Sequence, residues 1–485
     1  MATNNLKTTT IRSLFWKLFE QGGTAIVSLV IQVVLAHLIS PERFGELAIM
    51  LVFVNVGNVI VQSGLNTAII QSPDATERDY STVFWMSLVM SIVSYAIVFF
   101  AAPAVADFYA MPSTVWPLRV LVLVLIINAY NAIQEAIVAR NLDFRKTATA
   151  TVVAGIVSCT VGVWIALRDG GIWALVIQQL LQQACKCVVL AFEIDWKPQL
   201  VFELDRAIVM FRFGWKLLAS GLLEQGYQSL SDLLIGKVFT KTDLGYVSQG
   251  KKYPLALGAL LDGAIQPVML SAASRVQDDV DQVKRLARRA LKTSTFLIIP
   301  AMALFAVAAE PIVRIVLGPQ WLPSVPFVRA YCLIYAMLPI HTTNLQVLNG
   351  MGRSDLFLRL EVIKKIVSIS MLCFTAFVLR SLYAIVGGYI VAAVLCTFIN
   401  AHPNKRVIGY AYMEQVRDIL PAVLLTLLAA AAAYPVSQLA LNDFLMVLAQ
   451  GVVMAGVYLL AAWLFRMEEF TYLLNTAREM LQSRS

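Results

Sequence analysis

The sequence predicts an all-α, polytopic membrane protein with about 14 transmembrane helices. Composition is the first reason: hydrophobic residues make up 59% of the 485 residues and charged residues 14%, and the mean hydropathy is +0.74. A soluble domain has roughly 45–50% apolar and about 25% charged residues. The second reason is the length of the apolar runs, which reach the roughly 20 residues that a spanning helix needs. The third is a weak internal repeat, which predicts two parallel six-helix halves followed by two further helices.

The internal repeat relates residues 14–200 to positions about 200–212 further along the chain. The matched segments occur in the same order and at the same points of the hydrophobic pattern: Trp16 with Trp215, Ser40–Gly45 with Thr240–Gly245, Gln134 with Gln346, and Leu167-Arg168 with Leu379-Arg380. Many secondary transporters are built from such paired repeats. Because six is even, both halves enter the membrane from the same side, so we expect a pseudo-symmetry axis along the membrane normal.

The first half is expected to contain six spanning helices. Each is an apolar run of about 20 residues or more, and the runs lie at 15–38, 46–70, 82–106, 117–139, 147–167 and 172–192. Residues 1–10 are polar and lack the pattern of a cleavable signal peptide, so we expect the first span to direct insertion. Transmembrane strands are excluded because the runs are about twice too long for a barrel strand and do not alternate apolar with polar residues.

The second half repeats this pattern, with runs at 214–238, 252–273, 292–316, 327–349, 359–379 and 381–401. Two further runs, 417–437 and 446–465, have no counterpart in the repeat. The predicted domains are an N-terminal half at 1–192, a cytoplasmic linker at 193–213, a C-terminal half at 214–401, and an additional helix pair with a cytoplasmic tail at 402–485. No intervening loop exceeds roughly 22 residues, so we expect no soluble domain, no phosphate-binding glycine loop and no ATP hydrolysis.

The distribution of positive charge predicts the orientation of the chain. With the N-terminus in the cytoplasm, about 27 of the 38 Lys and Arg residues fall on the inner side and about 10 on the outer side. This asymmetry follows the positive-inside rule and predicts that both termini are cytoplasmic. It also accounts for the formal net charge of +8 without nucleic acid as a partner.

Two groups of cations need a separate explanation. Residues 275–292 are basic, with small apolar residues at helical spacing, which predicts an amphipathic helix on the inner membrane surface. It would either bind anionic lipid or tether the neighbouring spans. The second group brackets an outer turn and consists of Lys237, Lys241, Lys251 and Lys252. These lysines either reach the membrane interface with their ammonium groups or form a cationic rim for a phosphate.

Polar residues inside spans one and seven are candidates for a binding cavity. A charge at bilayer depth costs several kcal/mol, so it usually faces a cavity or a partner. Span one carries Glu20 and Gln21, and span seven carries Glu224, Gln228 and Asp232. The spacing i, i+4, i+8 places the last three on one helix face. This stripe either binds substrate or a coupling ion, or pairs with neighbouring helices.

Spans two and eight carry the next polar groups. Span two has Asn55, Asn58, Gln62 and Asn66 on a single face, and its counterpart, span eight, has Asp262 and Gln266. Buried amides often bond one helix to another. They also suit a hydroxyl-rich substrate, because an amide is both donor and acceptor. The sequence leaves both interpretations open.

Isolated cations complete the set of candidate site residues. Lys186 lies within span six and needs either a carboxylate partner or a water-filled cavity. Arg140, Arg353 and Lys364 lie near the inner ends of spans and would suit a diphosphate, which Arg binds bidentately. They also lie where positive-inside residues belong.

The sequence predicts no metal site and no cofactor. The six cysteines all lie in apolar runs, and Cys185-Lys186-Cys187 is one residue too tight for the usual metal-binding pair. The three histidines, His37, His341 and His402, are scattered along the chain.

Four segments resemble bacterial polysaccharide flippases, which export O-antigen and capsule units and belong to the multidrug/oligosaccharidyl-lipid/polysaccharide superfamily. These segments are residues 34–48, 134–146, 243–252 and 271–279. The resemblance covers about residues 10–410 and is strongest to the branch that includes the colanic acid exporter. His37 stands where this family would be expected to have arginine.

The resemblance implies the fold of multidrug and toxin extrusion (MATE) transporters and a flippase function. Such a protein moves an undecaprenyl-diphosphate-linked oligosaccharide from the inner to the outer leaflet of the bacterial cytoplasmic membrane, for capsule, exopolysaccharide or O-antigen synthesis. Its halves would rock about a cavity lined by spans one, two, seven and eight. The implied partners are the lipid-linked substrate, membrane lipids, a coupling ion (H⁺ or Na⁺) and a glycan polymerase.

Two alternatives are weighed against the flippase. A cation-coupled multidrug or small-molecule antiporter of the same superfamily would usually have twelve spans, so the additional pair disfavours it. A membrane glycosyltransferase or polymerase would need catalytic residues on a sizeable outer loop, and the outer loops here are short and poor in acidic residues. We therefore expect a transporter and not an enzyme.

Overall fold

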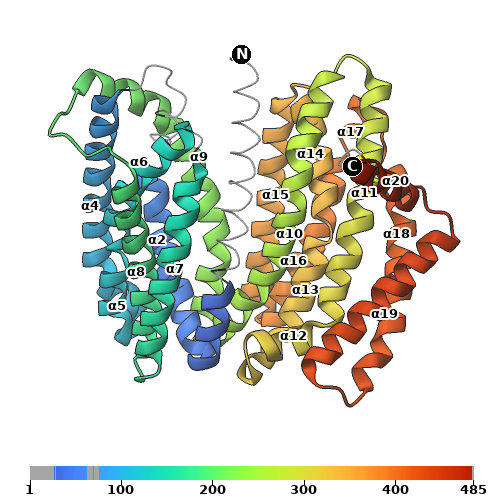
Figure 1. Cartoon of the computed structure of the whole chain (residues 1–485), viewed down its shortest axis with the longest axis horizontal. Helices are drawn as coiled ribbons and strands as arrows, with labels where there is room; N and C mark the ends of the chain where they lie inside the picture. The colour runs from blue at the N-terminus through green and yellow to red at the C-terminus, as the bar shows by residue number, and fades with distance from the viewer. Residues whose placement is uncertain (1–26, 28, 63–68, 70–75, 142, 483–485) are drawn as a thin grey trace. The chain divides into compact units, whose positions relative to one another are not determined.

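The computed structural model describes residues 27, 29–62, 69, 76–141 and 143–482. In these ranges the chain forms helices and no strand (Figure 1). Eleven of the helical segments are long and apolar enough to cross a membrane. The predicted all-α, polytopic class is therefore confirmed.

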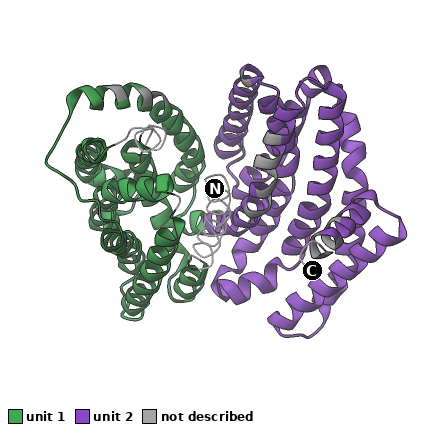
Figure 2. Ribbon diagram, turned by 45° about the horizontal axis from the view of Figure 1, so that its top comes forward, with its two compact units in different colours: residues 1–245 green, residues 246–485 purple. Residues whose placement is uncertain are grey.

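The chain divides into two compact units, residues 1–245 and 246–485 (Figure 2). The first unit contains the counterparts of predicted spans two to seven, and the second unit contains those of spans nine to fourteen. Helix α10 (Lys241–Arg275), which forms span eight, begins in the first unit and continues in the second. The predicted domain division at 193–213 follows the sequence repeat and stays a prediction.

The helices of the first unit agree with the predicted spans. They are α2 (Pro41–Gln62), α4 (Glu77–Phe108), α5 (Val115–Leu121), α6 (Val124–Asn141), α7 (Phe144–Ala166), α8 (Ile172–Glu193) and α9 (Leu204–Val238), with the 3-10 turn η1 (Pro112–Thr114). Predicted span four consists of α5 and α6, separated by a turn at 122–123. Aromatic and aliphatic side chains of α4, α6 and α8 form a buried core with Trp196, which follows α8.

The second unit contains α11 (Val280–Val307), α12 (Ala309–Val316), α13 (Val325–Tyr335), α14 (Leu338–Gly350), α15 (Ser354–Phe374), α16 (Leu382–Ala401), α17 (Asn404–Val407), α18 (Tyr412–Ala433), α19 (Asp443–Leu464) and α20 (Glu468–Gln482), with short segments η2 (Pro319–Ser324), η3 (Thr375–Leu379) and η4 (Tyr434–Gln438). Span ten is interrupted between α13 and α14, as span four is between α5 and α6. Pro339 accounts for this break, because a proline clashes with the carbonyl four residues earlier, and α13 ends at that residue, Tyr335.

Helices α9 and α10 are 35 residues long, which corresponds to about 52 Å at 1.5 Å per residue. Both exceed the roughly 30 Å thickness of the hydrocarbon core. Neither is among the eleven most apolar segments, and both carry charged residues along their length. Spans seven and eight are thus the most polar of the predicted spans in the described part of the chain.

The amphipathic segment predicted at 275–292 is not a helix of its own. Helix α10 ends at Arg275, and the basic residues from Lys284 onward form the first turns of α11, which continues into span nine. Lys284, Arg288 and Lys292 follow one another at i, i+4, i+8 and each contacts a carboxylate of the C-terminal helices: Glu414 at 2.9 Å, Asp418 at 2.7 Å, and Glu468 and Glu469 at 3.0 and 2.8 Å. The basic stripe therefore tethers the additional helices.

The additional helices α18 and α19 also contact the repeat at two further levels. The Tyr458 hydroxyl donates to the Phe296 carbonyl at 2.8 Å within the apolar core that α11, α18 and α19 share. Near the other end of α19, Arg314 of α12 contacts Asp443 at 3.1 Å. Helices α18 and α19 are therefore an integral part of the second unit, although the sequence repeat does not include them.

The segment between α8 and α9 is fixed to the start of α4. The Gln199 N–H donates to the Ser81 hydroxyl at 3.1 Å, and the Trp85 indole donates to the Gln199 carbonyl at 2.8 Å. The Glu203 N–H donates to the Thr82 hydroxyl at 3.2 Å. Within the predicted linker, this part of the backbone is thus held by hydrogen bonds.

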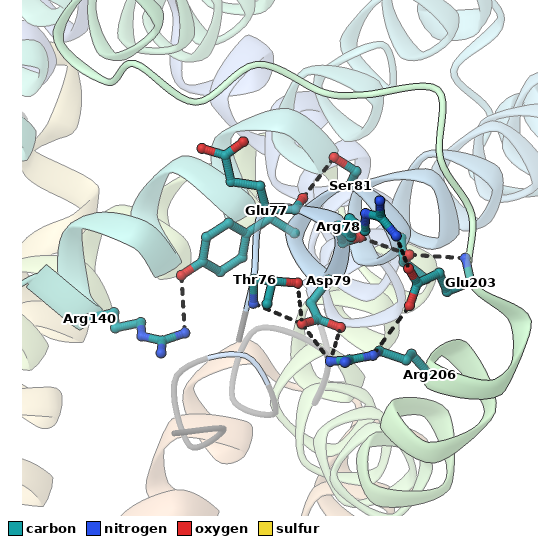
Figure 3. Close-up of polar contacts among 10 residues, drawn as sticks. Thr76, Glu77, Arg78, Asp79, Ser81, Arg140, Glu203 and Arg206 are labelled. Atoms are coloured by element: carbon teal, nitrogen blue, oxygen red, sulfur yellow. Dashed lines mark hydrogen bonds and ion pairs between the residues drawn. The ribbon is translucent and has the colours of Figure 1, made fainter. Parts of the chain in front are cut away.

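Asp79 is the centre of this attachment (Figure 3). Its side chain is 0% exposed and accepts from the Thr76 N–H and hydroxyl, at 2.8 and 2.9 Å, which caps α4. Arg206 of α9 contacts both carboxylate oxygens, at 2.9 and 2.8 Å. Glu203 bridges Arg206 and Arg78, at 3.3 and 3.5 Å. One buried carboxylate therefore joins the first turn of α4 to the first turn of α9.

Candidate functional site

Helix α9 presents an open polar face in the first unit. Glu224 and Gln228 are both exposed, and the Gln228 amide donates to the Glu224 carboxylate at 3.0 Å. A Cβ added at Gly226 would meet nothing within 4 Å. Asp232, one turn beyond Gln228, is half-buried and interacts with other residues. Two of the three residues of the predicted stripe are thus exposed together.

Helix α2 divides its predicted polar face between two environments. Asn55 and Gln62 are exposed. Asn58 instead accepts a hydrogen bond from the Asn128 amide of α6 at 2.8 Å, so it bonds one helix to another. The remaining candidates of spans one and two, Glu20, Gln21 and Asn66, lie outside the described residues.

Lys186 has the carboxylate partner that its position requires. Its ammonium group contacts the Glu135 carboxylate of α6 at 2.5 Å, and the two side chains are 20% and 42% exposed. On the same face of α6, the Asn131 and Gln134 amides donate to the carbonyls of Gln183 and Cys187, at 3.1 and 3.3 Å. Lys186 is therefore part of a polar contact between α6 and α8.

Helix α10 presents an open face of a different kind in the second unit. Lys252, Ala256, Ala259, Gly263 and Gln266 are exposed at spacings of four and three residues, so they share one helix face. The three central residues are small, and a Cβ at Gly263 would meet nothing within 4 Å. Lysine and glutamine thus lie at opposite ends of a stripe whose middle leaves room for another molecule.

Lys252 is the least compensated cation of this face. Among the described residues, it makes no ion pair or hydrogen bond. It lies about 16 Å along α10 from Lys241, at 1.5 Å per residue, and at the outer end of the predicted span 252–273. A lysine of a spanning helix that has no carboxylate partner needs access to water, so this face of α10 suits an anionic ligand.

Two other lysines of the predicted outer rim have structural contacts. Lys237 donates to the Phe108 carbonyl at 2.6 Å and lies 3.8 Å from the centre of the Phe108 ring. Lys241 lies 3.6 Å from Glu46 and 3.9 Å from Glu42. These contacts hold Lys237 and Lys241 against neighbouring helices and distinguish them from Lys252.

The three cations predicted to face a diphosphate also have partners within the chain. Arg140 donates to the Tyr80 hydroxyl at 3.1 Å (Figure 3). Arg353 contacts Asp355 at 3.4 Å, and Lys364 contacts Glu361 of the same helix at 2.6 Å. Their placement therefore favours Lys252 over them as the cation that is available to a ligand.

Matching helix pairs carry different polar contacts in the two units. Between spans two and four, the contact is the neutral Asn58–Asn128 pair. Between spans eight and ten, the Thr342 hydroxyl donates to the Asp262 carboxylate at 2.8 Å. The two halves thus join corresponding spans by polar contacts of different chemistry, and Asp262 lies one turn beyond the position that the repeat matches with Asn58.

Sequence reasoning did not select Glu135, and it named Lys252 only as one of four lysines of an outer rim and Asp262 only as a polar residue of span eight. Glu135 could have been found as a carboxylate in the same half as Lys186, which needed a partner of opposite charge. For Lys252, the signal was the run of small residues at helical spacing that follows it. Asp262 gave no comparable signal, because its importance depends on which groups surround it.

Some polar residues of the second unit attach α18. Asn344 and Gln415 donate to one another, at 2.8 and 2.9 Å, and Asn404 donates to the Asn344 carboxamide oxygen at 2.6 Å. All three are buried, as expected for amides that bond helix to helix. Across the described ranges, no group of three His, Cys, Asp or Glu residues has the arrangement of a metal site.

Comparison with known proteins identifies the family that these features belong to. A family model described as "Polysaccharide biosynthesis protein" matches residues 34–326. The succinoglycan biosynthesis transport protein ExoT of Rhizobium meliloti is 22% identical over 419 residues, which are 86% of this chain and 82% of ExoT. The lipopolysaccharide biosynthesis protein WzxC of Escherichia coli is 21% identical over 425 residues, 86% of this chain and 85% of WzxC.

Solved structures with the same fold are also found. The lipid II flippase MurJ, in an inward closed conformation, gives a TM-score of 0.77 at 15% identity and covers 94% of this chain and 99% of its own. An inward-facing multidrug resistance MATE family transporter of the MOP superfamily gives 0.61 at 14% identity, covering 79% and 95%. At these identities the likeness concerns the fold, and it agrees with the predicted MATE-like architecture.

Proposed function

This chain belongs to the polysaccharide biosynthesis protein family, and we propose that it is a flippase for a lipid-linked oligosaccharide. It would move undecaprenyl-diphosphate-linked units from the inner to the outer leaflet of the bacterial cytoplasmic membrane, for the synthesis of a surface polysaccharide. The family match carries the proposal, because it extends over more than half of the chain.

The relatives support a role in transport rather than catalysis. The name of ExoT describes a transport protein of succinoglycan biosynthesis, and that of WzxC a protein of lipopolysaccharide biosynthesis. The chain aligns with more than four fifths of each. Both names concern surface polysaccharides, whose repeat units would be the cargo.

The open faces of α9 and α10 supply chemistry that suits this substrate. A diphosphate needs a cation that is not already neutralised, and Lys252 is such a cation. Sugars need groups that both donate and accept, and Gln266 and Gln228 are exposed amides. The polyprenyl chain would stay in lipid, because it has no polar group that needs water.

We further propose an inner-membrane location with cytoplasmic termini, which rests on the distribution of Lys and Arg. A glycan polymerase is the expected partner at the outer leaflet, where exported units would be joined. The proposal includes no catalytic step, since flipping moves the lipid-linked unit without changing a covalent bond.

Deletion of the gene tests the proposed function. We expect lipid-linked repeat units to accumulate on the cytoplasmic leaflet, where a membrane-impermeant glycan-oxidising reagent does not reach them in intact spheroplasts. Surface polysaccharide at the normal level in the deletion strain would contradict the proposal. A changed drug susceptibility with normal polysaccharide would instead favour the multidrug antiporter, which the MATE-like fold also accommodates.

Variants in the deletion strain test the open faces. Lys252→Met is expected to abolish export at a normal protein level, whereas Lys252→Arg keeps the positive charge and should retain it. Glu224→Gln and Asp232→Asn are expected to impair export through α9. Full export by Lys252→Met would exclude α10 as the site for the diphosphate.

A further inference from the structure

Asp262 of α10 is a carboxylate with only half of its hydrogen-bonding capacity used. Its Oδ2 accepts from the Thr342 hydroxyl of α14 at 2.8 Å. Its Oδ1 is buried and has no hydrogen-bond partner among the described residues. An ionised carboxylate exposes two acceptor oxygens, whereas the protonated form carries a proton on one of them. The environment of Asp262 therefore resembles one built for the neutral acid.

Among the described residues, no positive charge contacts Asp262. Contacts at Gly250, Gly258 and Gly350 show that α10 packs against α11, α13 and α14. Two titratable groups on these helices lie near Asp262. His341 of α14 is hydrogen-bonded through its Nδ1 to Asn400 at 2.9 Å. Tyr335 of α13 stacks on Tyr331. Met302 of α11 lies near Gly258, and residues 296–307 around it carry no charge.

The charges on α10 itself are distant. Lys252 precedes Asp262 by about 15 Å and Arg275 follows it by about 20 Å, at 1.5 Å per residue. At such distances, a lysine gives little stabilisation to a carboxylate when water separates them. The hydroxyl of Thr342 remains the one direct partner found in the described part of the chain.

Two physical arguments then favour a proton on Asp262. Asp262 is half-buried with its Oδ1 fully buried, and withdrawing an ion from water without a counter-charge favours the neutral form. An ionisable group inside a transmembrane bundle also commonly marks a proton pathway. Protonation at Oδ1 would remove the charge and leave the hydrogen bond from Thr342 to Oδ2 intact.

A contact in the first unit shows that a carboxylate is not needed to join spans of this kind, because Asn58 of span two accepts from Asn128 of span four at 2.8 Å. The repeat that matches Gly45 with Gly245 places Gln62, one turn after Asn58, at the position of Asp262, so the first unit has a neutral amide there. Asparagine at position 262 could accept from Thr342 in the same way. The property that Asp262 adds is the ability to bind and release a proton.

We propose that Asp262 is the proton-binding group that couples the transport cycle to the proton gradient. In this conformation it holds a proton as a carboxylic acid. When a conformational change opens the region to water, the O–H bond breaks, the proton passes to water, and the carboxylate becomes hydrated. The proposal rests on the proposed transport function for its role in the cycle, but the proton site itself can be tested without a substrate.

Infrared spectroscopy of the purified full-length protein tests the proton site. We expect the carbonyl band of a protonated carboxylic acid at neutral pH, loss of that band on titration to alkaline pH, and its absence in Asp262→Asn at every pH. Thr342→Val keeps the carboxylate and should keep a shifted band. If Asp262→Asn leaves the wild-type spectrum unchanged, the proposal is overturned. It is also overturned if NaCl raises the thermal midpoint of the wild type relative to choline chloride and Asp262→Asn abolishes this rise, because that result would indicate a sodium site.

A flipping assay in inverted membrane vesicles, with and without an imposed pH gradient, tests the coupling. The wild type should respond to the gradient, and Asp262→Asn should flip at a rate that no longer depends on it. Asn128→Ala, which disrupts the neutral contact between spans two and four, should keep the response. If flipping by Asp262→Asn still depends on the gradient, Asp262 is not the coupling group. If the wild type does not flip the substrate at all, the transport function is rejected, and the infrared result alone decides whether Asp262 is a proton site.

Discussion

Gly45 of α2 and Gly245 of α10 lie back to back where the two helices begin. A Cβ on Gly45 would be 1.8 Å from the carbonyl oxygen of Lys241, and one on Gly245 would be 2.1 Å from the carbonyl oxygen of Pro41. Each glycine thus contacts the residue four positions before the other. The two turns are those that the sequence repeat matches, so repeated segments meet through their glycines.

Substitution at this crossing should destabilise the protein. Gly45→Ala or Gly245→Ala must displace backbone, because the obstructing atoms are carbonyl oxygens, and overpacking typically costs about 1–3 kcal/mol. The thermal midpoint of a fluorescent fusion in detergent should fall for either variant. The double variant should fall by less than the sum, because both changes open the same crossing. Gly456→Ala is the control, since its Cβ would meet nothing within 4 Å.

The Glu135–Lys186 pair should behave as a coupled unit. Glu135→Gln leaves the Lys186 ammonium without its partner inside the membrane, which is strongly destabilising when a charge is buried. Since both side chains are partly exposed, the loss should be smaller than the roughly 3–5 kcal/mol of a fully buried pair. Glu135→Gln with Lys186→Met should recover most of the stability in thermal unfolding. An unstable double variant would show that the pair is not what holds α6 and α8 together.

Loss of Arg206 should detach α9 from α4. Arg206→Ala leaves the buried Asp79 carboxylate with only its capping contacts, and a cost near the lower end of about 3–5 kcal/mol is expected because Arg206 is half-exposed. Hydrogen exchange at residues 194–206 should rise. Arg78→Ala is a matched control, because this exposed ion pair is expected to contribute at most about 1 kcal/mol. Equal exchange in both variants would contradict the role of Asp79.

The attachment of α20 should depend on pH. The hydrogen bond from Lys292 lowers the pKa of Glu468 below its ordinary value of 4.5. A lowered pKa stabilises the docked helix above the ordinary value, and this contribution is lost as pH falls through the lower one. Hydrogen exchange in α20 should therefore stay slow from neutral pH down to about 5 and rise in more acidic buffer.

The control for α20 is Lys292→Gln, which removes both ion pairs of Lys292. Its α20 should exchange faster already at neutral pH and respond less to acid. Amides of α19 measured in the same samples separate undocking of α20 from unfolding of the whole unit. Acid-induced exchange in α20 that Lys292→Gln does not change would show that Glu468 is not responsible.

The helical class, the positions of the described spans and the family could all be predicted from the sequence. These features depend on local properties: the length of an apolar run decides whether a helix can cross the bilayer, and the short motifs lie within single segments. The weak repeat also marked matching places, including the turns that contain Gly45 and Gly245.

The sequence could not predict which polar side chains are partners and which are exposed, because this depends on how the helices pack. Asn58 and Gln62 lie one turn apart on α2, yet Asn58 bonds to Asn128 while Gln62 is exposed. Lys241 and Lys252 lie on one helix, and Lys241 alone has a nearby carboxylate. Periodicity assigns a residue to a face of its helix, but the neighbour opposite that face depends on how distant helices pack, which no local pattern specifies.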